Sequence, residues 1–295
     1  MYPAGKAGQA GRGQGPVQPP AMPHDDPSNI ENPFFASNWR LARPADIRRM
    51  AVVATCCFRD TEIFKRLYPE HKRYPSDTLR RYCQVFKGMM ESNDHSVYVA
   101  ERDYTAAEMR ILPYPRQKLA KDVDPLKVTQ KRVVAGVIIY KIPPGAPQIG
   151  AQGFRKQPGI YPRLAVNQDR DLDKAFLENV NEKAEEAQSQ YLKGFVTLQF
   201  YAEHPSYKDN HRPLVTSSSL DQNTINGCKL AVGEPIKYGV LASPEQARLY
   251  ERMTSNFVRV ASIELDKFDH PKMCLHIFTW KRSETDLFGN PIGIP

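Results

Sequence analysis

Two apolar segments in the second half of the chain constrain its fold more than any other feature. The first, Phe195–Ala202, is rich in β-branched and aromatic residues, and the second runs from Ile236 to Leu241. A long polar stretch separates them, and a short amphipathic segment that ends in Leu249-Tyr250 follows the second. The pattern predicts two strands joined by a long connection, with a short helix after the second strand.

The rest of the chain adds helices before the first apolar segment and strands on both sides of it. Helical spacing of apolar residues predicts three helices between residues 44 and 90 and a fourth from Asp171, the expected N-cap, to Tyr191. Further strands are expected at residues 39–42, 96–101, 133–140, 258–265 and 273–280. This series favours an α+β fold in which helices flank a mixed, mostly antiparallel sheet.

Composition sets the limits of the folded part. Residues 1–30 are rich in Gly, Pro, Gln and Ala and offer little to bury, so we expect a disordered, low-complexity segment there. We expect one domain over residues 39–282, with Pro-rich insertions near 102–130 and 142–165, and a C-terminal tail over 283–295.

Charge and cysteine content narrow the class of protein. The 295 residues carry a formal net charge of +8, which favours anionic partners, but the basic pairs are scattered and fit a solvated surface better than nucleic-acid binding. The five cysteines show no Cys-x-x-Cys spacing, so we expect neither a disulfide framework nor a metal site. We see no secretion leader and no apolar run of membrane-spanning length, and so expect a soluble intracellular protein, cytoplasmic or nuclear, without membrane association.

Three motifs give the chain a more specific resemblance. Arg43-Pro44-Ala45-Asp46 precedes the first helix, His204-Pro205-Ser206-Tyr207 ends a strand, and Ala242-Ser243-Pro244 leads to Leu249-Tyr250-Glu251-Arg252. In this order they resemble the GNAT N-acetyltransferase superfamily over residues 39–282. The resemblance implies the GNAT fold and acetyl-CoA as the cofactor.

The resemblance also implies where acetyl-CoA would bind. The strand that ends at Glu203 and the strand that begins at Ile236 should lie side by side and diverge, so that freed backbone groups of the first can pair with the pantetheine arm. The residues implied in cofactor binding are Phe200, Tyr201, Ala202, Lys208, Asn210, His211, Arg212 and Ser243.

The loop that would hold the pyrophosphate departs from the family pattern. His211 and Pro213 stand where the family has glycines, and Asp209 adds a negative charge. Glycine allows close approach to a phosphate, whereas proline removes one N–H donor. The motif is therefore degenerate, although Lys208, His211 and Arg212 could compensate through their side chains.

Two residues match catalytic positions. Tyr250 matches the tyrosine that protonates the leaving thiolate in the family, and Glu203 is a candidate general base. Either could instead be structural, Tyr250 by packing its helix on the sheet and Glu203 as a solvent-facing strand carboxylate. We interpret His204 as a turn determinant rather than a catalytic residue.

The sequence leaves two functions open. The first is acetyl transfer from acetyl-CoA to an amine of a small molecule or of a protein. The second is a catalytically degenerate GNAT-fold module that has lost the cofactor and acts in protein interaction or assembly. The sequence does not identify the acceptor, because acceptor specificity in this fold lies in variable helices and insertions.

Overall fold

Seven strands form one sheet in the order β1-β2-β3-β4-β5-β7-β6. The computed structural model describes residues 39–110, 114, 119–121, 132–143, 160–207, 237–253, 257–265 and 273–280, all within one unit, Glu31–Pro295. The strands are β1 (Trp39–Leu41), β2 (His95–Asp103), β3 (Arg132–Lys141), β4 (Val196–Glu203), β5 (Tyr238–Ala242), β6 (Phe257–Glu264) and β7 (Cys274–Trp280). Each lies within a few residues of a segment predicted to be a strand.

Every pairing in the sheet is antiparallel except the one between β4 and β5. That pair is parallel and extends over three positions, Val196–Leu198 against Tyr238–Val240. The sheet is thus mixed and mostly antiparallel, as the sequence predicts.

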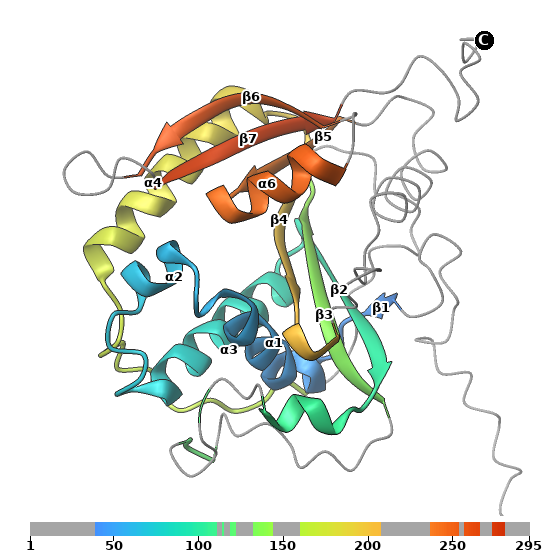
Figure 1. Ribbon diagram of the computed structural model, residues 1–295, viewed down its shortest axis with the longest axis vertical. Helices are drawn as coiled ribbons and strands as arrows, with labels where there is room; N and C mark the ends of the chain where they lie inside the picture. The colour runs from blue at the N-terminus through green and yellow to red at the C-terminus, as the bar shows by residue number, and fades with distance from the viewer. Residues whose placement is uncertain are drawn as a thin grey trace, which may run out of the picture. The chain divides into compact units, whose positions relative to one another are not determined.

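Helices cover the sheet unequally (Figure 1). On the first face, α1 (Ile47–Phe58) and α3 (Pro75–Glu91) lie against β2, β3 and β4, while α4 (Lys174–Tyr191) lies against β6 and β7. The short α2 (Glu62–Leu67) contacts α4. On the second face, α6 (Pro244–Met253) lies against β5, β6 and β7. Short 3₁₀ turns occupy Pro44–Asp46, Ala106–Arg110 and Pro205–Tyr207.

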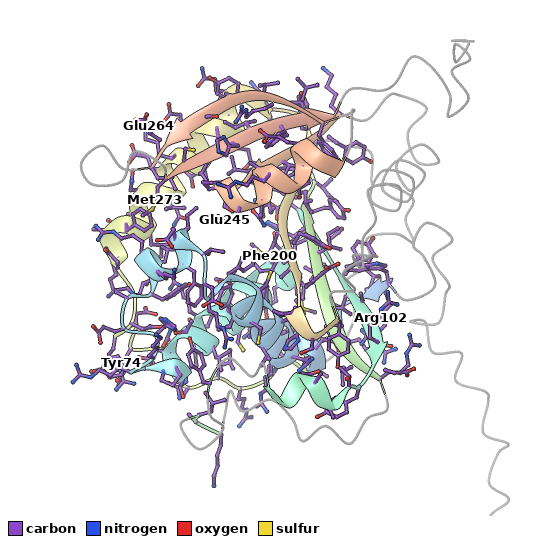
Figure 2. All side chains as sticks on the ribbon, in the orientation of Figure 1. Tyr74, Arg102, Phe200, Glu245, Glu264 and Met273 are labelled. Carbon is purple, nitrogen blue, oxygen red and sulfur yellow. The ribbon has the colours of Figure 1, made fainter. Side chains whose placement is uncertain are left out.

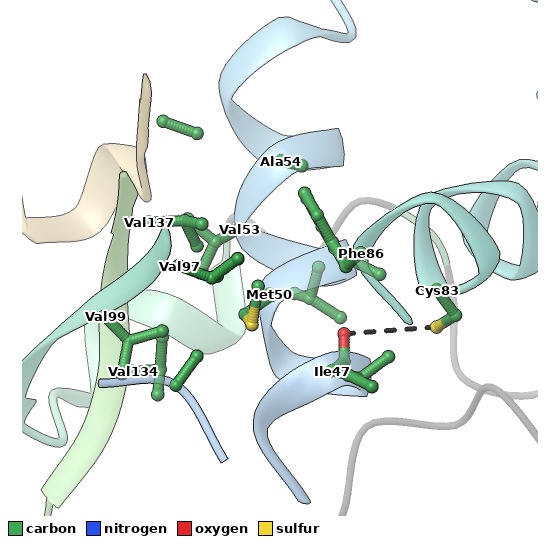
Figure 3. Close-up of a cluster of buried hydrophobic side chains, with 14 of the residues drawn as sticks. Ile47, Met50, Val53, Ala54, Cys83, Phe86, Val97, Val99, Val134 and Val137 are labelled. Atoms are coloured by element: carbon green, nitrogen blue, oxygen red, sulfur yellow. Dashed lines mark hydrogen bonds between the residues drawn. The ribbon is translucent and has the colours of Figure 1, made fainter. Parts of the chain in front are cut away.

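The core of the first face lies between α1, α3 and the sheet (Figure 3). Val53 of α1 lies beside Val97 and Val137 of the sheet, whereas Phe86 of α3 lies on the other side of α1. The buried Cys83 thiol donates a weak hydrogen bond to the Ile47 carbonyl at 4.0 Å. Apolar residues every three or four positions give α1 and α3 this buried face, as the periodicity predicts. The methionines and Cys83 serve packing here.

The N-terminus of α4 differs from the prediction. The helix begins at Lys174, and the side chain that caps it belongs to Asp173, which accepts a hydrogen bond from Phe176 N at 3.0 Å. Asp171 was wrongly predicted as the cap. It is buried, and its carboxylate instead accepts a hydrogen bond from the Thr78 hydroxyl of α3. Asp171 lies two positions before the actual cap and makes a tertiary contact with α3, which the sequence near the helix start does not reveal.

Part of the predicted insertion over 102–130 is packed rather than lying over the surface. Glu108 and Tyr114 are buried, and Leu119 and Ala120 pack against the core of the first face. The segment is therefore tied to the domain at several described positions. This differs from the irregular surface excursion that its prolines suggest.

Candidate active site

The point where β4 and β5 diverge is the centre of the candidate site. Beyond Leu198 the described residues of β4 pair only with β3, for example Ala202 with Val137 and Glu203 with Gly136. Strand β5 ends at Ala242 and leads directly into α6. The β5-facing edge of β4 from Gln199 to Glu203 is therefore open to pair with a ligand, because no described strand occupies it.

A β-bulge marks the same point. Leu198 pairs with Tyr140 and Phe200 pairs with Ile139, so Gln199 is an extra residue in β4. A bulge places two successive side chains on one side of the strand. Consequently Val196 and Leu198 lie in the core of the second face, whereas Phe200 packs with the core of the first face.

On the second face, β4 and α6 bring the two predicted catalytic residues to one region. Tyr201 donates a hydrogen bond from its hydroxyl to Glu203 Oε1. Tyr250 of α6 packs in the same cluster as Tyr201, and its ring lies 5.4 Å from that of Phe257 and 5.7 Å from that of Phe278. Glu203 and Tyr250 are each 3% exposed, so Glu203 is not the solvent-facing carboxylate that its strand position allowed.

Burial keeps both tyrosines in their protonated form. It raises the pKa of Tyr250 far above its ordinary value. Burial, the negative charge of Glu203 and the hydrogen bond to Glu203 raise the pKa of Tyr201, and Tyr250 adds to the same effect. Tyr250 can therefore donate a proton at neutral pH but cannot act as a base there.

On the first face, a cavity of about 380 Å³ opens at the divergence point. It lies between β4 and β5 on one side and α2, α3 and α4 on the other, and Phe200, labelled in Figure 2, stands at its β4 wall. The apolar lining residues are Phe58, Ile63, Phe64, Leu67, Tyr82, Met89, Val180, Ala184, Leu192, Phe200, Leu241 and Leu275. The polar ones are Thr61, Gln188, Thr197, Gln199, Ser243 and Gln246.

None of these lining residues carries a charge at neutral pH. Tyr82 is the only one with a titratable side chain, and burial raises its pKa well above the ordinary value. Two of the lining amides bond to groups outside the cavity: Gln188 Oε1 accepts from Lys141 Nζ at 3.0 Å, and Gln199 Oε1 lies 2.9 Å from His95 Nε2. Of the two groups that contact these amides, Lys141 carries a full positive charge.

Ser243 lies at the junction of the cavity and α6. Its hydroxyl accepts a hydrogen bond from Gln246 N at 3.3 Å, while Gln246 Oε1 accepts from Ser243 N at 3.1 Å. This is a capping box, and Pro244 occupies the first helical position. The predicted cofactor-binding Ser243 is therefore the N-cap of α6, beside the divergence point.

The His-Pro-x-Tyr motif anchors the end of β4. His204 Nδ1 accepts a hydrogen bond from Ser206 N at 3.3 Å, which closes a turn as expected. Tyr207 donates to Glu108 Oε2 at 2.5 Å, and Glu108 also forms a buried ion pair with Arg49 of α1. Burial, with the positive charge of Arg49 second, lowers the pKa of His204 to about 4. The motif therefore has a structural role: its hydrogen bonds hold the end of β4, and with it Glu203, in place.

Four predicted cofactor-binding residues, Lys208, Asn210, His211 and Arg212, lie outside the described residues. Sequence reasoning placed acceptor specificity in part at residues 60–90, which include α2, but missed Gln199 and the cavity wall from α4. The α4 wall could not be predicted, since it depends on how α4 packs. Among the residues that the structure describes, no group of acidic, histidine or cysteine side chains could hold a metal ion, and no helix is long and apolar enough to span a bilayer.

The chain was compared with known families, proteins and solved structures. No family model matches the chain. An acetyltransferase from the fungus Stachybotrys chartarum is 29% identical over 213 residues, which are 69% of this chain and 79% of that protein.

Two solved structures match most of the chain at low sequence identity. A histone acetyltransferase and related acetyltransferase from Corynebacterium glutamicum is 14% identical, with 88% of this chain and 97% of that one covered and a TM-score of 0.42. A protein of the GNAT acetyltransferase family from Desulfovibrio desulfuricans is 11% identical, with 82% and 97% covered and a TM-score of 0.38. The diverging parallel pair is the arrangement that the sequence predicted, and the chain is similar to a fungal protein named as an acetyltransferase.

Proposed function

We propose that this GNAT-fold chain transfers an acetyl group from acetyl-CoA to an amine. The observation that carries the proposal is the parallel pair β4–β5, which separates after three positions directly beside a cavity. Where the two strands diverge, acetyl-CoA can reach free backbone groups of β4. The amine can then reach the bound acetyl group from the adjacent cavity.

The described residues fit acetyl-CoA at the diverging strands. The edge of β4 over Phe200–Ala202 has no strand partner among the described residues and so offers backbone groups to an amide-bearing arm, while its side chains lie on both faces of the strand. Bound there, acetyl-CoA would supply an acyl group activated as a thioester. Lys208, Asn210, His211 and Arg212 remain the predicted contacts of the pyrophosphate.

Tyr250 and Glu203 divide the proton transfers in this proposal. Tyr250 stays protonated because it is buried, so it would donate a proton to the leaving thiolate. Glu203 accepts a hydrogen bond from the Tyr201 hydroxyl. Through that hydroxyl it would take the proton that the amine loses, or it would hold Tyr201 in position near Tyr250. Both roles use side chains that the fold holds within one buried cluster.

Binding of acetyl-CoA is the direct test. Titration of the full chain with acetyl-CoA, followed by calorimetry and by thermal unfolding, should show saturable binding and a higher melting temperature. A ligand at about 100 times its Kd stabilises the folded state by about 2.7 kcal/mol. Acetylated product, detected by mass spectrometry with an amine mixture, would complete the test.

A contradicting result is equally specific. No shift at millimolar acetyl-CoA, together with stable co-purification of another macromolecule, would replace this proposal with the interaction or assembly module. Coenzyme A without the acetyl group is the matched control, since it should bind but give no product.

A further inference from the structure

We propose that the acceptor is an uncharged aromatic amine, whose ring occupies the cavity on the first face of the sheet. This inference rests on the proposed acetyl transfer and adds the class of acceptor. Its basis is the position of the cavity, its volume and the chemistry of its walls.

The position of the cavity suits an acceptor rather than the thioester donor. Its walls include Thr197, Gln199 and Phe200 of β4 and Leu241 of β5, so it reaches the divergence point from the first face. On the second face, Tyr250 packs in one cluster with Tyr201, which donates a hydrogen bond to Glu203. A molecule in the cavity therefore faces a donor lying along the open edge of β4.

The volume and shape suit a small ring. A cavity of about 380 Å³ lies near the lower end of the range for small-molecule sites, about 300–1,000 Å³. Phe58 and Phe200 meet edge to face with centroids 5.3 Å apart, and Tyr82 and Phe200 do so at 6.4 Å. Aromatic rings prefer such edge-to-face or offset contacts, so a further ring can pack against these.

The electrostatics of the lining argue against a cationic amine. An alkylamine is protonated at neutral pH, and transfer of an ammonium group into an apolar site costs much free energy unless a carboxylate pairs with it. No residue of the described lining is acidic, and Lys141 bonds to the lining residue Gln188. An arylamine avoids the cost because its nitrogen lone pair is delocalised into the ring and the amine is neutral at pH 7.

A neutral acceptor also simplifies the transfer. The arylamine nitrogen already carries a lone pair, so the carbon–nitrogen bond can form before any proton leaves. With acetyl-CoA bound, the nitrogen would lose one proton to solvent or to Glu203, and Tyr250 would give one to the departing thiolate. The products are an anilide and free coenzyme A, with Tyr250 reprotonated from solvent.

The experiment compares two amines that differ by one methylene group. Aniline is neutral at pH 7 and benzylamine is protonated, while both carry the same ring. Binding of each to the full chain is measured by calorimetry without acetyl-CoA, and kcat/KM is measured with it. We expect aniline to bind at least about tenfold more tightly than benzylamine, because burial of an unpaired charge costs more than tenfold in affinity.

A variant tests whether the cavity sets this preference. Gln246→Glu places a carboxylate on the cavity wall and keeps an oxygen that can accept the hydrogen bond from Ser243 N. It should raise the affinity for benzylamine relative to aniline by about tenfold. Arg248→Gln, on the exposed side of α6, changes the net charge by the same amount outside the cavity and should leave the ratio unchanged.

The outcomes separate the two proposals. Tighter binding of benzylamine to the unmodified chain, binding of neither amine, or an unchanged ratio in Gln246→Glu would overturn the acceptor inference. Failure of acetyl-CoA to bind would refute acetyl transfer, and with it the acceptor role, but not the preference of the cavity for a neutral aromatic amine, since the amine affinities are measured without acetyl-CoA.

Discussion

At the scale of single residues, Tyr250 has a structural and a proposed chemical role that one substitution separates. Tyr250→Phe keeps the ring contacts with Phe257 and Phe278 but removes the proton donor. Loss of a general acid typically lowers the rate about 10²–10⁴-fold, so we expect kcat to fall at least about 100-fold. The affinity for acetyl-CoA and the melting temperature should stay close to those of the unmodified chain. Unchanged kcat would leave Tyr250 only the packing role.

Asp171 predicts a pH dependence of stability. Burial raises its pKa from 3.8 to about 6, so the folded state binds the proton more tightly than the unfolded state. Its contribution therefore favours folding at low pH and is lost as the pH rises from about 4 to about 6. By linkage this loss is about 3 kcal/mol.

Asp171→Asn isolates that contribution. The amide can keep the contact with the Thr78 hydroxyl but does not titrate. In urea unfolding from pH 4 to pH 8, the stability of the variant relative to the unmodified chain should rise with pH through this window. A difference that is constant across the window would contradict the predicted titration.

Residue types predicted much of the candidate site, but not its contacts. The resemblance pointed to Tyr250, Glu203 and Tyr201, and the fold brings these three into one region. That Tyr201 bonds to Glu203 follows from the two-residue period of a strand and could have been expected. That Asp171 is buried against Thr78 could not, because the contact joins residues 93 positions apart.

At the scale of elements, the strand β5 depends on one glycine. A Cβ atom at Gly239 would lie 2.3 Å from Leu192 Cδ2, and Leu192 is buried in the cluster with Ala187 and Ile277. We expect Gly239→Ala to reduce the free energy of unfolding by about 1–3 kcal/mol, as overpacking of a core does. Chemical denaturation measures the change.

Gly88 of α3 provides the matched control. It has open space around its Cα atom and no positive φ, so Gly88→Ala should stabilise the protein by about 0.5–1 kcal/mol. If the clash at Gly239 is the cause, adding Leu192→Ala to Gly239→Ala should cost less than the sum of the two single changes. Additive effects would point to another cause.

Elements were predicted better than their irregularities. Alternation and helical spacing identified every described strand and the helices α1, α2, α3 and α4 within a few residues. The bulge at Gln199 was not predicted, because the sequence around it keeps an unbroken strand pattern. Because of that extra residue, Phe200 lies on the first face, whereas unbroken alternation from Leu198 would have placed it on the second face with Tyr250.

At the scale of the whole molecule, the sheet consists of two parts joined by only three paired positions between β4 and β5. The mostly antiparallel order was predicted, whereas the short join follows from packing that no local pattern encodes. A ligand bound along the open edge of β4 would form further hydrogen bonds with that strand and so stabilise the region where the two parts meet.

Hydrogen exchange tests that expectation across the chain. With saturating acetyl-CoA, amides of β4 from Gln199 to Glu203 should exchange at least about tenfold more slowly, while those of β1 and β2 serve as the internal control. Equal protection of β4 with and without acetyl-CoA would place the ligand elsewhere.

The two sides of the sheet also bear on the order of events in the proposed reaction. Acetyl-CoA along the open edge of β4 and the amine in the cavity on the first face would each have a binding place of its own. Neither would have to depart before its counterpart arrives. Steady-state kinetics should then show intersecting lines typical of a ternary complex, with no half-reaction in the absence of the amine.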